Sequence, residues 1–130
     1  EYHLEKVQLL AARGTRLAHP SNDLGMHRCF CALASARLGD LKRARNEIEY
    51  ARRLEPERAD IAYRSACAYS LMGETALALQ WLETAVERGH LELWWARVDP
   101  DLDTLRELPR FKGIMSDWDS RIQALLEQGT

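Results

Sequence analysis

The 130-residue chain has no apolar run long enough to cross a membrane and no charged-then-apolar signal segment at its start. Its 18 Lys and Arg are interleaved with 20 Asp and Glu, so the net charge is −2 and no basic stripe forms. Proteins that bind nucleic acid usually need such a stripe to neutralise phosphates. We therefore expect neither a membrane nor a nucleic acid as a partner.

Cysteine is also scarce. The three cysteines are an odd number, which argues against a disulfide framework and favours a reducing, cytoplasmic setting. Apolar residues make up 46% of the chain, which is too many for a disordered segment and enough for a packed core. At this length we expect one domain, short for an enzyme with a deep active-site cleft.

Motifs that carry catalytic or metal chemistry are missing as well. His27 and Cys31 lie one helical turn apart around Cys29, but no second Cys/His pair completes the four ligands that zinc needs. We interpret the thiols as small packing residues. The chain has no nucleophile elbow and no phosphate-binding glycine run. We expect no enzyme activity, no metal and no cofactor.

The acidic and histidine side chains have simpler explanations than a site. Asp99, Asp101 and Asp103 lack the glycine and the distal glutamate of a calcium loop, so we interpret them as helix-capping residues. No histidine has a carboxylate at catalytic spacing. We expect solvated or loop positions for His3, His19, His27 and His90.

What the sequence does contain is an internal repeat of 34 residues. Residues 32–40 align with residues 66–74, small residue against small residue and apolar against apolar. The offset continues through the pairs Gly39 and Gly73, Ala44 and Ala78, Ile48 and Leu82, and Ala51 and Ala85. A fixed period of this length is typical of helical repeat arrays.

Each repeat is predicted to form two antiparallel helices. Residues 24–38 carry apolar side chains at helical spacing, and Gly39 is expected to end that helix in the left-handed conformation. Asp40 is a suitable N-cap for the next helix, which runs to about Leu54 before Pro56 prevents its continuation. The plan recurs over residues 57–72 and 74–88, with Gly73 and Gly89 as the stops.

This pattern resembles tetratricopeptide repeats. The matching residues are Ala44, Ile48, Ala51, Leu54 and Pro56 in the first repeat, and Ala66, Tyr69, Gly73, Ala78, Leu82 and Ala85 in the second. The early Trp of the usual signature is absent from both, and His90 stands where Pro56 would recur. The resemblance implies an all-α fold of antiparallel helix hairpins, stacked as a right-handed superhelical solenoid with a C-terminal capping helix.

The flanks extend the array, so that residues 1–130 are expected to be one domain. Residues 2–18 repeat the spacing of a second helix and are interpreted as the remainder of a truncated preceding repeat. Two repeats follow over residues 24–57 and 58–90, and residues 91–128 form an atypical final repeat and cap.

The last part resembles the closing segment of tetratricopeptide arrays at the C-terminal ends of bacterial multidomain signalling proteins. Asp99 is a good N-cap, and Pro100 and Pro109 suit first helical positions. An apolar stripe is predicted to cover the end of the array: Phe111, Ile114, Met115, Trp118, Ile122 and Leu125.

In such arrays the first helix of each hairpin lines a concave groove. The residues expected there are Met26, Cys29, Leu33, Ala36 and Arg37, then Asp60, Tyr63, Arg64, Cys67 and Ser70, with Trp94 near the end of the groove. Their neutral, partly apolar character argues against the carboxylate clamp of chaperone-binding relatives. Since Trp94 and Trp95 are adjacent, one is expected to pack inward and the other to be exposed.

The expected function is that of a protein–protein interaction module, a scaffold or regulatory segment that binds a peptide or helix in this groove. Three alternatives stay open. The groove residues could face a missing upstream repeat or the chain's own cap. The segment could be a regulatory tail that docks onto a kinase, cyclase or transcription-regulator domain of its parent protein. A homodimer could form through the exposed truncated end.

Overall fold

The computed structural model describes residues 23–129, and every regular element in that range is a helix. The all-α class predicted from the sequence is therefore confirmed for these residues, whereas the predicted helix over residues 2–18 lies outside them. The elements follow in the order α2 (Leu24–Arg37), α3 (Leu41–Leu54), α4 (Ala59–Leu71), α5 (Thr75–Glu87), α6 (Leu93–Ala96), the 3₁₀ helix η1 (Pro100–Leu105) and α7 (Pro109–Gln128).

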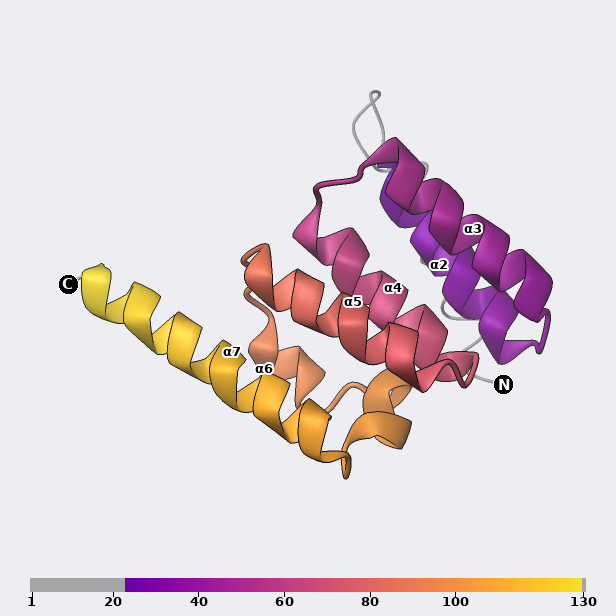
Figure 1. The fold of residues 1–130 in the computed structure, drawn as a ribbon. Coiled ribbons are helices and arrows are strands. Elements are labelled where there is room, and N and C mark those ends of the chain that lie inside the picture. The colour runs from indigo at the N-terminus through magenta and orange to yellow at the C-terminus, as the bar shows by residue number, and fades with distance from the viewer. Residues whose placement is uncertain (1–22, 130) are drawn as a thin grey trace.

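The helices pack as hairpins, α2 with α3 and α4 with α5 (Figure 1). The two hairpins lie side by side because α4 also packs against α2 and α3. The remaining elements continue the arrangement, since η1 packs against α4 and α7 packs against α5 and α6. No helix among the described residues combines the length and the apolar character that crossing a bilayer requires.

Three of the four hairpin helices, α2, α4 and α5, end in the same way, whereas α3 ends at Glu55 with an extended φ of −139°. Gly39, Gly73 and Gly89 have φ angles of +84°, +80° and +89°, the left-handed conformation predicted for these stops. The next amide then donates to a carbonyl of the helix that has just ended, from Asp40 to Ser35, from Glu74 to Tyr69 and from His90 to Ala85. The Asp40 carboxylate accepts from the Arg43 amide at 3.2 Å, so the predicted N-cap is confirmed.

The helix starts recur with the period of the sequence. The second helices α3, α5 and α7 begin at Leu41, Thr75 and Pro109, and 75 − 41 and 109 − 75 both equal 34. α4 and α6 begin at Ala59 and Leu93, which are also 34 residues apart. The short helices α6 and η1 therefore occupy the position of the first helix in a third hairpin. α7 occupies the position of the second helix in that hairpin.

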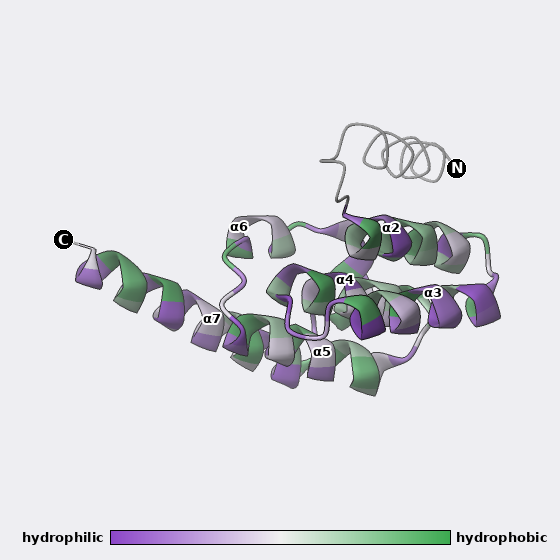
Figure 2. Ribbon diagram, turned by 90° about the horizontal axis from the view of Figure 1, so that it is seen from above, coloured by the Kyte–Doolittle hydropathy of each residue, from purple (hydrophilic) through white to green (hydrophobic). Residues whose placement is uncertain are grey.

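The core follows the same period. The side chains of Ala32, Ala44, Ile48 and Ala51, and their counterparts Ala66, Ala78, Leu82 and Ala85, are all 0% exposed. Alanine at these positions lets the helix axes approach closely. The same cluster continues into Leu102 and Leu105 of η1 and Phe111, Ile114 and Trp118 of α7. Figure 2 shows that polar and apolar residues alternate along α3 and α7.

The apolar stripe of α7 covers the body along only part of its length. Phe111, Ile114 and Trp118 are buried, but Leu125 is 53% exposed, so the expectation that it belongs to the covering stripe is wrong. The reason is length: α7 has 20 residues and α5 has 13, so the end of α7 runs past its packing partners (Figure 1 and Figure 2).

Enlarging either repeat alanine should force the paired helices apart. We predict that Ala44→Leu and Ala78→Leu each lower the free energy of unfolding by roughly 1–3 kcal/mol, because both side chains are fully buried and overpacking strains the core. Ala76→Leu is the matched control, since Ala76 is exposed on α5. Chemical denaturation measures all three. Equal stability of the buried and exposed variants would contradict the packing described here.

Candidate functional site

The face of α4 that points away from α5 is covered by residues 99–105, which comprise Asp99 and η1 and are called the closing segment below. The Tyr63 hydroxyl on α4 donates to Asp99 Oδ2 at 2.6 Å, and the Cys67 thiol lies 3.6 Å from the same oxygen. Asp99 is 1% exposed, and its other carboxylate oxygen accepts from the Asp101 amide at 3.0 Å. Asp99 is thus the N-cap of η1, as predicted, and also the anchor of that segment on α4.

Further polar contacts fix the same segment. Arg37 at the end of α2 forms an ion pair with Asp101, which is 7% exposed. The Ser70 and Thr104 hydroxyls lie 3.0 Å apart. Four of the expected groove residues, Arg37, Tyr63, Cys67 and Ser70, therefore bind the closing segment and are not open to a partner there.

The buried group of Cys67, Asp99 and Asp101 resembles a metal site in spacing, since its ligand atoms lie within 4.8 Å of one another. Its chemistry does not suit one. Burial, followed by the nearby Asp99 carboxylate, raises the pKa of the Cys67 thiol well above its ordinary value. A thiol must lose its proton to bind a metal, and Arg37 already pairs with Asp101. Hydrogen bonding and helix capping explain the cluster.

None of the described thiols is activated as a nucleophile. Burial raises the pKa of Cys29 to about 12, and burial together with Glu47 raises that of Cys31. Cys31 Sγ lies 3.7 Å from His27 Nε2, as expected for residues one helical turn apart, while Cys29 is fully buried. At neutral pH these thiols stay protonated, which makes them poor nucleophiles.

The expected groove is largely closed by packing. Cys29, Leu33 and Ala36 on α2, and Tyr63, Cys67 and Ser70 on α4, are at most 6% exposed. Their placement on an open surface has to be corrected, because these small and apolar side chains lie in the interfaces between neighbouring elements. Trp94 is 67% exposed and Trp95 packs against the core, which confirms that only one of the pair points inward.

An open cleft of about 500 Å³ remains where the starts of α2 and α4 meet the loop after α5. Three expected groove residues line it: Met26, Asp60 and Arg64. The other residues that shape it, chiefly Phe30, His90, Leu91 and Glu92, were not predicted from the sequence. Phe30 and Arg64 are 34 residues apart, as are Met26 and Asp60, so the repeat itself could have indicated this second stripe.

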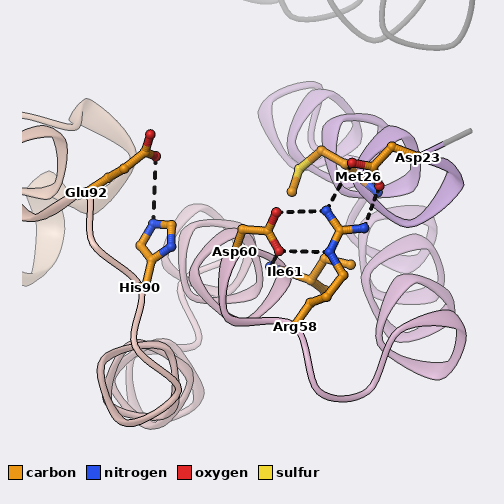
Figure 3. A network of polar contacts seen from close by, with 7 residues as sticks. All are labelled: Asp23, Met26, Arg58, Asp60, Ile61, His90 and Glu92. Carbon is orange, nitrogen blue, oxygen red and sulfur yellow. Dashed lines mark hydrogen bonds and ion pairs between the residues drawn. The ribbon is translucent and has the colours of Figure 1, made fainter. Parts of the chain in front are cut away.

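A charge network holds one wall of the cleft (Figure 3). The Arg58 guanidinium donates to both carboxylate oxygens of Asp23 at 2.6 and 3.0 Å, and to both of Asp60 at 3.0 and 2.7 Å. The hydrogen bond from Arg58 holds the pKa of Asp23 below its usual value. Arg58 thus joins the start of α2 to the start of α4 and compensates the charge of Asp60.

His90 forms the opposite wall. Its ring stacks on Tyr63 with centroids 4.8 Å apart, and its backbone carbonyl accepts from Trp118 Nε1 at 2.7 Å. Burial lowers the pKa of His90, and this outweighs the opposing effect of Glu92, whose Oε1 lies 3.8 Å from His90 Nε2. His90 is therefore neutral at pH 7. His90 lies in the loop after α5, as expected, but its side chain is only 9% exposed.

Arg64 lies between these walls. Its guanidinium carbon is 5.4 Å from the Phe30 ring centroid and 5.5 Å from that of Tyr63. Within residues 23–129 no carboxylate forms an ion pair with it, in contrast to Arg58. The open part of the surface is therefore charged and partly aromatic, not neutral as the sequence suggested.

No protein-family model matches the chain, and no solved structure matches it significantly. A chloroplastic protein of Arabidopsis thaliana is 37% identical over 65 residues, which cover 49% of this chain and 19% of that protein. The chain thus spans about a fifth of the length of this curated relative.

Titration of His90 should make stability depend on pH. The pKa of His90 is lowered on folding, so the unfolded chain binds more protons, and stability falls as pH drops below the unfolded value of about 6.5. We predict that His90→Phe, which retains a stacking ring, flattens the dependence of the unfolding free energy between about pH 5 and pH 7. Free energies of unfolding, measured by chemical denaturation at several pH values in this range, test the prediction. Parallel curves for wild type and variant would contradict a buried neutral His90.

Proposed function

We propose that this chain is a tetratricopeptide-type array whose function is to bind a peptide segment of another protein. The 34-residue spacing of the helix starts, the positive-φ glycines that end the helices and the periodic buried alanines support this class. Such arrays present rigid helix faces to their partners. The right-handed superhelical stacking of the hairpins belongs to this proposal.

We further propose that the partner binds in the cleft between α2, α4 and the loop after α5. The observation that carries this is the combination, in one place, of open volume, apolar side chains and a cation, Arg64, that has no carboxylate partner among residues 23–129. Leu91 at the rim is 61% exposed, while Met26 and Phe30 are partly buried against the core. Binding sites typically combine an apolar lining with a few fixed polar groups.

The same observations favour binding over catalysis. The described thiols have raised pKa values, and His90 stacks on Tyr63 beside Glu92 with no nucleophile among residues 23–129 hydrogen-bonded to it. A nucleophile and a base within hydrogen-bond distance would be needed for covalent catalysis. Among residues 23–129, η1 packs on the middle of α4, whereas the cleft at the start of α4 stays open.

A display experiment tests the site. Randomised dodecapeptides are selected on the wild-type chain and then re-tested on Leu91→Asp and on the control Leu126→Asp. Both leucines are 61% exposed, so neither change should unfold the chain, but only Leu91 lies at the cleft. We predict that selected peptides bind Leu91→Asp at least about tenfold more weakly, since burying a new carboxylate is costly, and bind the control unchanged.

Two results would contradict the proposal. One is the absence of any enriched peptide on folded wild-type chain. The other is a set of peptides whose binding is lost in the α7 control and retained in the cleft variant. Circular dichroism and thermal melting of each variant show that the fold is intact.

A further inference from the structure

We infer that the cleft binds an acidic side chain of the partner segment through Arg64, next to an apolar side chain held by Met26 and Phe30. This inference rests on the proposed function and specifies the chemistry of its ligand. The class of partner is an extended peptide with a single Asp or Glu close to a large apolar residue.

The charges around the cleft lead to this assignment. Asp60 is compensated by Arg58, which also holds Asp23. His90 is neutral at pH 7, and Glu92, whose side chain is 50% exposed, lies beside it at the rim. Arg64 is the cation that lines the cleft and has no carboxylate partner within the described part of the chain. A partly buried guanidinium in this state favours an incoming carboxylate.

Arg64 is also held in place before a ligand arrives. Its guanidinium lies over the rings of Phe30 and Tyr63, and the Tyr63 ring is fixed by the hydrogen bond to Asp99. A planar guanidinium that stacks on aromatic rings keeps its N–H edge free for two parallel hydrogen bonds to a carboxylate. Such preorganisation lowers the entropy lost on binding.

The other residues of the cleft limit the number of acidic side chains that a bound peptide can carry. Glu92 and Asp60 line the same space, so a run of acidic residues would meet like charges there. Met26, Phe30 and Leu91 offer apolar surface beside Arg64. In an extended peptide, side chains two residues apart point to the same side, so one acid and one apolar residue at this spacing fit together.

The experiment uses peptides selected on the wild-type chain and lost on Leu91→Asp. Each is resynthesised with its acid replaced by the matching amide, Asp by Asn or Glu by Gln, and affinity is measured by fluorescence polarisation. We expect the amide peptide to bind about tenfold more weakly to wild type, since it cannot accept the charge-assisted hydrogen bonds. On Arg64→Gln we expect acid and amide peptides to bind equally.

Charge reversal adds a second, independent measurement. Selection on Arg64→Glu should enrich Lys or Arg at the position where wild type enriches Asp or Glu, while Arg64→Lys should retain the acid. Lys42→Glu is the matched control, because Lys42 is exposed on α3 away from the cleft and its reversal should leave the selected peptides unchanged.

The outcomes separate the two proposals. Peptides that require the cleft but show no acid preference, or the same preference on Arg64→Glu, would overturn the role of Arg64 and leave peptide binding intact. If no selected peptide depends on the cleft, the proposed function fails and this inference fails with it. If Arg64→Glu does not fold, the comparison of acid and amide peptides on wild type and on Arg64→Gln still tests whether Arg64 binds the acidic side chain.

Discussion

A buried hydrogen bond from Tyr63 to Asp99 is the contact on which the rest of the structure depends. It joins α4 to the closing segment across 36 residues of sequence, at a donor–acceptor distance of 2.6 Å between side chains that are at most 1% exposed. The acceptor, Asp99, also caps η1. The ring of the donor, Tyr63, stacks on His90 and lies close to the guanidinium of Arg64. One side-chain pair therefore closes the inner face of the second hairpin and shapes the cleft beside it.

This arrangement explains why the open surface lies at the ends of the first helices. The middle of α4 is covered by η1, and the repeated small residues bring α2 close to its neighbours. At the starts of α2 and α4 no such covering element is described, and the loop after α5 leaves a space that is lined by Asp60, Arg64 and His90. A partner segment that binds there would meet side chains already held in place by their contacts, which lowers the conformational entropy that the protein loses on binding.

The sequence predicted the helix ends and the hairpin pattern, because both depend on residues that are close together in the chain. Glycine adopts positive φ without a side-chain penalty and so commonly ends a helix. The helix ends at Gly39, Gly73 and Gly89 could therefore be predicted from the sequence. The cleft could not, because it depends on which surfaces the closing segment covers. Three features depend on tertiary packing between residues that are distant in the sequence. Asp99 accepts a hydrogen bond from Tyr63, the side chain of His90 is buried, and α7 extends past the end of α5.

A double-mutant cycle with Tyr63→Phe and Asp99→Ala tests the central claim most directly. Free energies of unfolding are measured for wild type, both single variants and the double variant, so that the loss of the η1 cap cancels from the coupling energy. A direct buried hydrogen bond predicts a coupling of roughly 0.5–3 kcal/mol. Additive effects of the two substitutions would show that Asp99 does not hold Tyr63, and the positioning of the cleft by this contact would be wrong.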